Sequence, residues 1–212
     1  KVVNICEIKD FAFSIPVVPW NKIYRRDFLV REKIVFPKLA FHEDLAFFLE
    51  LIVKAKKIAF LDEFLTIHRI NIATSLNSNQ TRNENWQGGL IIYQETDKRI
   101  TKLSSFKEIE NEYLMHKMGA ILNWYQRTTE PQQELFFYEM KPMLKQAYED
   151  FDLKKFSDDN MLRWLKVKFL AIYLNIIINN KNYHTVRNKL KCIGFLLNIR
   201  HKMLMLISNV RR

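Results

Sequence analysis

Residues 43–57 read EDLAFFLELIVKAKK: an acidic pair, a mostly apolar run and a lysine-rich end. This pattern predicts one helix over residues 42–57, because acids favour the first turn of a helix and cations the last, where they meet the two ends of its dipole. Glu43 and Asp44 then lie in the first turn, where the dipole favours their ionised forms. A deprotonated carboxylate at a loop–helix junction can act as a general base if a substrate hydroxyl reaches it. The alternative is that the pair only caps the helix.

Several short motifs surround this pair. Before it come WNKIYRR (residues 20–26), FL (28–29) and FP (36–37), and after it come KAKKI (54–58), DEFL (62–65), HR (68–69) and TS (74–75). The succession resembles the C-terminal half of the catalytic domain in family 2, GT-A-type glycosyltransferases of bacterial polysaccharide synthesis. The resemblance covers about a third of the chain and ends near residue 85.

The resemblance implies an inverting sugar transfer from a nucleotide-sugar donor to a hydroxyl of a glycan or lipid-linked acceptor. Asp44 would take the proton of that hydroxyl, and Glu43 would orient or shield Asp44. The implied substrate-binding residues on the acceptor and diphosphate side of the cleft are Trp20, Asn21 and Lys22.

The resemblance also implies contacts at the HR motif. Arg69 would bind the nucleotide diphosphate, because the planar guanidinium group matches phosphate oxygens. His68 would complete a metal site. Family members often carry a second basic residue two positions later, where this chain has Asn71.

The sequence departs from this family at its start. Family members place a nucleotide-binding α/β half, with an Asp-x-Asp metal motif, before the tryptophan segment, whereas residues 1–18 precede it here. Asp150-Phe151-Asp152 spells that motif but follows the acidic pair, so we interpret it as a chance match. We therefore expect an enzyme fragment that is inactive alone. The divalent cation, Mg²⁺ or Mn²⁺, is expected in the intact enzyme and not on this fragment.

We expect two domains. The resemblance implies that residues 1–84 are an α/β remnant of a GT-A domain, and the helical patterns indicate that residues 85–212 form a predominantly α-helical domain. In the first domain we expect an edge strand within residues 1–18 from the period-two spacing of Phe11, Phe13 and Ile15, a helix over 26–33, and strands over 58–61 and 64–70.

Helical patterns fill the second domain. They cover residues 86–100, a long helix opened by a capping box at Ser104 or Ser105 with Glu108, and residues 135–148, 161–178 and 186–210. The last of these helices is amphipathic and basic.

The charge of +11 lies in the last quarter of the chain: no Asp or Glu follows Asp159, and 11 of the 34 Lys and Arg residues lie from Arg163 onward. Such a segment suits an anionic membrane surface, here residues 163–212. No apolar run reaches the roughly 20 residues that span a bilayer. With two distant cysteines, Cys6 and Cys192, we expect a cytoplasmic protein, peripheral at the inner face of the cell membrane.

Two other classes of protein remain as alternatives. One is a basic helical nucleic-acid-binding protein, although the chain has no helix-turn-helix, zinc-finger or RNA-binding signature, so nucleic acid is not the expected partner. The other is a non-catalytic interaction module in which the acidic pair is only a cap.

Overall fold

The computed structural model describes residues 2–39, 42–67, 69, 86–155 and 161–191. The first part contains β1 (Val2–Val3), η1 (Cys6–Ile8), α1 (Lys9–Ala12), η2 (Pro19–Asn21), α2 (Arg26–Arg31), α3 (Glu43–Lys54) and β2 (Ile58–Ala59). The second part contains α5 (Trp86–Ile100), η3 (Ser104–Glu108), α6 (Glu110–Arg127), α7 (Gln132–Asp150), η4 (Leu153–Lys155), α8 (Met161–Asn179) and a further helical segment over residues 183–191. The chain is therefore mainly helical, as predicted for its greater part.

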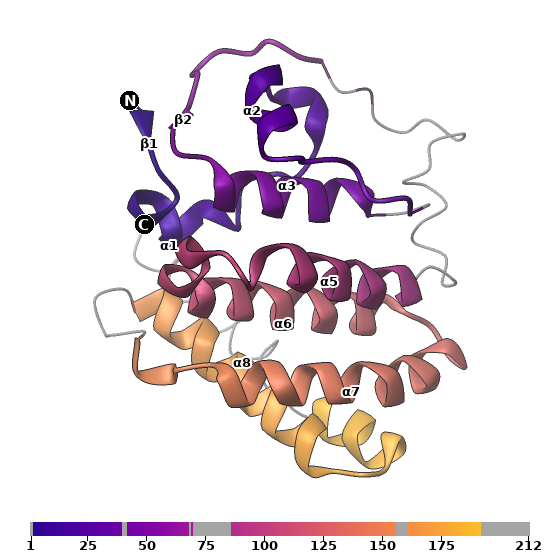
Figure 1. The fold of residues 1–212 in the computed structure, drawn as a ribbon. Coiled ribbons are helices and arrows are strands. Elements are labelled where there is room, and N and C mark those ends of the chain that lie inside the picture. The colour runs from indigo at the N-terminus through magenta and orange to yellow at the C-terminus, as the bar shows by residue number, and fades with distance from the viewer. Residues whose placement is uncertain (1, 40–41, 68, 70–85, 156–160, 192–212) are drawn as a thin grey trace, which may run out of the picture.

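The long helices stack in layers (Figure 1). α3 packs on α5, α5 and α6 lie side by side, and α7 packs on α6 and on α8, which also contacts α6. One hydrophobic core runs through all the layers, with fully buried side chains such as Leu49 in α3, Tyr93 in α5, Met118 in α6 and Phe136 in α7. The predicted domain boundary near residue 84 stays a prediction, and the helices on its two sides share this core.

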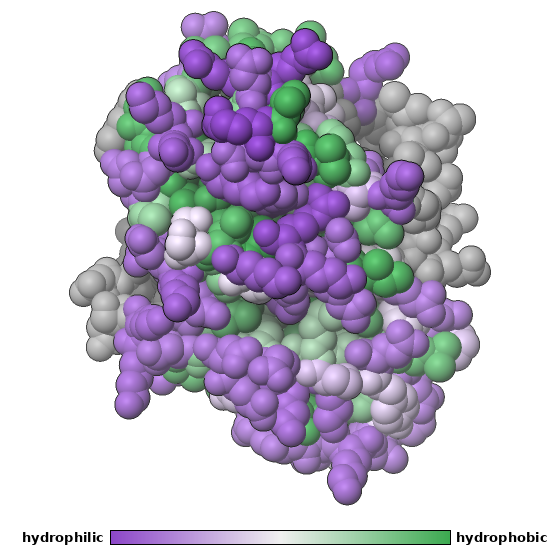
Figure 2. All heavy atoms as spheres, in the orientation of Figure 1, coloured by the Kyte–Doolittle hydropathy of each residue, from purple (hydrophilic) through white to green (hydrophobic). Residues whose placement is uncertain are grey.

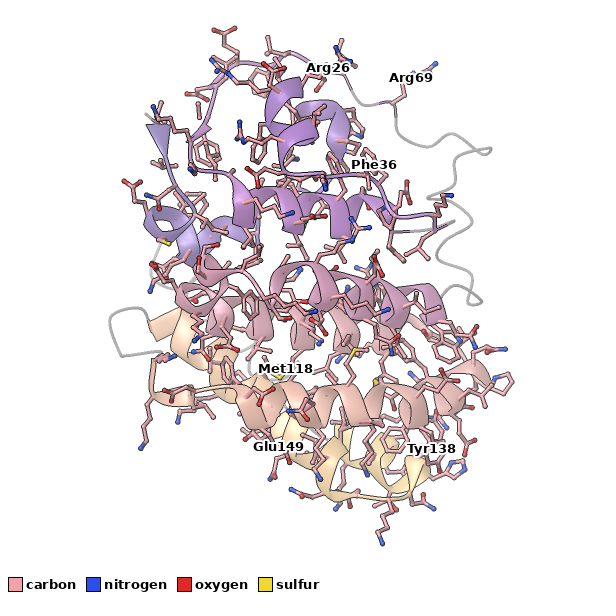
Figure 3. All side chains as sticks on the ribbon, in the orientation of Figure 1. Arg26, Phe36, Arg69, Met118, Tyr138 and Glu149 are labelled. Atoms are coloured by element: carbon pink, nitrogen blue, oxygen red, sulfur yellow. The ribbon has the colours of Figure 1, made fainter. Side chains whose placement is uncertain are left out.

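α3 is buried on every side from Leu45 to Val53, which explains its almost continuous apolar sequence. One side faces α5 and the main core. The other side forms a small second core with Ile34, against which residues of α2 pack. Phe36 stacks on Phe47 of α3 at a centroid distance of 3.9 Å and covers the helix from above in Figure 3.

The predicted first strand is mostly wrong. Among the described residues 2–18, only Val2 and Val3 form a strand, and they pair antiparallel with Ala59 and Ile58. The Asn4 side chain then accepts hydrogen bonds from the backbone N–H groups of Cys6 (2.9 Å) and Glu7 (3.2 Å) and turns the chain into helix. Phe11 lies in α1, and Phe13 packs on α6, so tertiary packing overrides the period-two spacing.

Of the two later strands, one is present and short. The strand predicted over 58–61 is confirmed at Ile58 and Ala59. Of the strand predicted over 64–70, residues 64–67 and 69 lie in no strand, and Phe64 and Ile67 are 108% and 96% exposed. No neighbouring strand in the described part of the chain supplies hydrogen bonds to this segment, and a strand is not stable alone. Figure 2 shows exposed apolar side chains among polar ones at this end of the molecule, around α2.

The helices after residue 85 follow the predictions closely, with one difference at the start of α6. Residues 104–108 form the short helix η3, and α6 begins at Glu110 after Ile109, which supplies no capping side chain. Ser105 instead donates a hydrogen bond to the carbonyl oxygen of Val53 at 3.3 Å and joins η3 to the end of α3.

The Asp-x-Asp sequence closes α7. The backbone N–H of Asp152 donates to Asn111 Oδ1 (2.8 Å), Asn111 Nδ2 donates to the carbonyl oxygen of Asp152 (2.9 Å), and Asp150 accepts a hydrogen bond from Gln146. These contacts favour the interpretation of the motif as a chance match.

The predicted terminal helix over 186–210 is described only to residue 191, which is helical. Residues 192–210 lie outside the described residues. Among the described helices, none combines the length and apolar character needed to cross a membrane.

Acid is expected to destabilise the fold through His116. This side chain lies in α6 beside Phe13 and Tyr93, and burial lowers the pKa of its imidazole from 6.5 to about 4. The unfolded chain therefore binds more protons below pH 6.5, so this stabilisation is present above pH 6.5 and is lost as the pH falls towards 4. The loss should reach about 3 kcal/mol.

Urea unfolding at pH 7 and pH 4.5 measures the effect, with His116→Leu as the control variant. Wild type should lose more stability than the variant between the two pH values. An equal loss in both proteins would contradict the prediction.

Candidate active site

The acidic pair begins α3 as predicted. Glu43 and Asp44 occupy the first turn, and His42 precedes them with φ 60°, in the left-handed region. This region costs a non-glycine residue roughly 1–2 kcal/mol. The His42 side chain makes no capping hydrogen bond. The strained residue turns the chain sharply into the helix and places Asp44 at the junction.

Asp44 is half-buried, and its pKa lies above the ordinary value. Burial is the main cause, and the negative charge of Glu43 adds to it. The backbone N–H of Leu45 and the nearby His42 act in the opposite direction but more weakly. Burial therefore acts against the ionised form that we expected the helix dipole to favour. A raised pKa makes this carboxylate a stronger proton acceptor than an ordinary aspartate.

Lys22 joins the tryptophan segment to α3, near enough to Asp44 for the two charges to influence each other. Its ammonium group donates to the carbonyl oxygens of Pro16 and of Val18 (2.8 Å) and to Asn21 Oδ1 (2.7 Å). It also lies 4.8 Å from the ring centroid of Phe48 in α3. Burial lowers its pKa, and the charge of Asp44 opposes this shift.

These contacts use all three N–H groups of the ammonium. Lys22 thus holds the segment 16–22 against α3 near Asp44. A contact of Lys22 with substrate stays a prediction, as does a contact of Asn21.

The other predicted site residues lie at different places. Trp20 lies in η2, and about half of its side chain is exposed (49%). Because Trp20 belongs to the segment that Lys22 holds, its exposed aromatic face has a fixed position near α3. Arg69 is exposed at the upper edge of the molecule, beyond α2 and α3 (Figure 3), and no contact joins it to the acidic pair among the described residues. His68 lies outside the described residues.

Sequence reasoning missed the support that α5 and α6 give to the start of α3. The His42 ring lies 5.0 Å from the ring of Trp124 in α6. Trp124 can come this close because α5 has Gly89 at the contact: a Cβ at this position would lie 2.4 Å from Trp124 Cε3. The adjacent glycines Gly88 and Gly89 inside a predicted helix were the available sequence signal for a close contact.

We expect alanine substitutions at Gly88 and Gly89 to change the stability of the protein in opposite directions. Gly89→Ala should destabilise the protein by about 1–3 kcal/mol, because the new methyl group collides with a rigid indole ring. Gly88→Ala should stabilise it by up to about 1 kcal/mol, because a Cβ there meets only His42 Cδ2 at 4.0 Å and alanine favours helix. Thermal unfolding of both variants tests the pair. Equal changes of the same sign would contradict the close contact.

A hollow of about 710 Å³ lies elsewhere, between α5, α6 and α7. Its wall includes the ion pair between Lys117 Nζ and Asp97 Oδ2, which are 2.6 Å apart, beside apolar residues such as Leu90 and Pro142. The hollow shares no lining residue with the start of α3, so it is not part of the candidate site.

No group of three or more His, Cys, Asp or Glu side chains is placed to bind a metal ion among the residues that the structure describes. These residues do not fit a divalent-cation site. The cation implied by the resemblance is therefore not assigned to any of them.

The chain matches no family model, and neither the curated proteins nor the solved structures show significant similarity to it.

Proposed function

We propose that this chain is the acceptor-side portion of an inverting, family 2-like GT-A glycosyltransferase. The intact enzyme transfers a sugar from a nucleotide-sugar donor to a hydroxyl of a glycan or lipid-linked acceptor. The observation that carries the proposal is the meeting of two sequence motifs at one place: Lys22 of the tryptophan segment lies over Phe48 of α3, one helical turn after Asp44.

Asp44 accepts the proton of the acceptor hydroxyl while that oxygen attacks the anomeric carbon. The carbon–oxygen bond to the nucleoside diphosphate breaks on the opposite face, so the configuration inverts. A half-buried carboxylate with a raised pKa supports this role, because it holds the proton more firmly than an exposed aspartate would. Glu43 raises the proton affinity of Asp44 through its charge.

Trp20 packs against the acceptor sugar through its exposed face, and Lys22 keeps Trp20 and Asn21 in place. Arg69 contacts the donor diphosphate when the rest of the donor site is present. The fragment alone is inactive, and no residue described in it supplies the cation site.

The enzyme is cytoplasmic and peripheral at the inner face of the membrane. The basic segment 163–212 contacts anionic lipid. Binding of the chain to anionic vesicles but not to neutral ones at low salt supports this contact, and equal retention by both contradicts it.

Transfer assays with the intact enzyme test the function. Nucleoside diphosphate should be released only when a hydroxyl acceptor is present, and the anomeric configuration of the product, read by NMR, should be inverted. A product with retained configuration, or transfer that does not depend on Asp44, would contradict the proposal.

A further inference from the structure

The start of α3 contacts a residue about 80 positions later in the sequence. His42, directly before Glu43 and Asp44, has a left-handed backbone, and its side chain makes no capping hydrogen bond. The residue that covers His42 is Trp124, whose ring lies 5.0 Å from the imidazole at an interplanar angle of 38°.

Trp124 also packs closely against α5. Gly89 removes the side chain that would otherwise keep α5 away from the indole, and the Tyr93 ring lies 5.8 Å from it. The indole thus contacts both α5 and the imidazole.

The loss of this contact would release the strain at His42. A non-glycine residue persists in the left-handed region only where its surroundings hold it there. Without the indole, the His42 backbone can relax to an ordinary conformation. The first turn of α3 and the Asp44 carboxylate would then move with it.

We propose that Trp124 is a positioning residue for the candidate base Asp44 and acts through its contact with His42. This inference deepens the proposed function and rests on it for the role of Asp44. It makes the helical part of the chain a component of the catalytic site, because α6 then sets the geometry of a carboxylate on α3.

The test uses Trp124→Leu and the conservative variant Trp124→Phe. In the wild-type chain, burial lowers the pKa of His42, whereas Glu43 and Asp44 on the same turn raise it. Gly88 of α5 and Trp124 of α6 contribute no charge next to the imidazole. In Trp124→Leu the His42 titration, followed by NMR, should shift upward towards 6.5, and the amide hydrogens of the first turn of α3 should exchange faster.

Trp124→Phe keeps an aromatic ring on His42 and should shift the titration less than Trp124→Leu. If the leucine variant does not fold, the pKa of His42 must still be higher in the phenylalanine variant than in wild type. An unchanged titration and unchanged exchange in a folded variant would overturn the proposal.

The same variants in the intact enzyme separate this inference from the proposed function. Trp124→Leu should lower kcat by up to about 10²-fold with a smaller change in KM, because a shift of about 1 Å in a reacting group has an effect of this size. Trp124→Phe should keep kcat close to the wild-type value. Loss of the NMR effect overturns the role of Trp124, whereas full activity of Asp44→Asn overturns the proposed function and leaves the NMR result standing.

Discussion

Asp44→Asn is expected to lower kcat of the proposed glycosyl transfer, assayed with the intact enzyme, by about 10²–10⁴-fold, the usual contribution of a general base. The amide keeps the size and much of the hydrogen bonding of the carboxylate but cannot accept the hydroxyl proton. KM should change little, because the acceptor still meets the same surface around Trp20. Steady-state kinetics of nucleoside diphosphate release measures the effect.

Asp27→Asn is the matched control. Asp27 also lies in the first turn of a helix, α2, but it is exposed. Its replacement should leave kcat within about twofold of wild type, since surface substitutions usually change free energies by less than 0.5 kcal/mol. Similar losses in both variants would mean that the acidic residue matters only for its helix, as the capping interpretation holds.

Glu50→Ala is expected to lower the free energy of unfolding by about 3–5 kcal/mol, the cost of leaving buried charges without their partner. Glu50 lies inside α3 and is only 5% exposed. Its two carboxylate oxygens lie 2.6 Å from Lys54 Nζ and 2.8 Å from Arg99 Nη1. Arg99 also donates to the carbonyl oxygen of Val35 at 2.8 Å, so the network joins α3, α5 and the loop before α3. Urea unfolding followed by circular dichroism measures the loss.

Glu95→Ala provides the comparison. Glu95 pairs with the same Arg99 at 3.0 Å, but its side chain is 33% exposed, so the loss should stay below about 1 kcal/mol. The double variant Glu50→Leu/Arg99→Met should be more stable than Glu50→Ala, because apolar side chains of similar volume remove the unpaired charge. A loss below 1 kcal/mol for Glu50→Ala would show that the network contributes little.

Local sequence patterns placed the long helices well. The apolar spacing located α5 at residues 86–100 and α3 within 42–57, because helix formation depends on residues three and four positions apart. Strand predictions were poorer. The segment 64–67 has strand-forming residues, but a strand needs a partner that local sequence does not reveal.

The sequence by itself determined that an acidic pair begins a helix and that a tryptophan–lysine segment precedes it, since both are local patterns. Only the tertiary structure decided the surroundings of that pair. The burial that raises the pKa of Asp44, the oxygens that satisfy Lys22 and the contact of Trp124 with His42 depend on folding. These interactions act over a few ångströms between residues that can be far apart in the chain, so no local pattern encodes them.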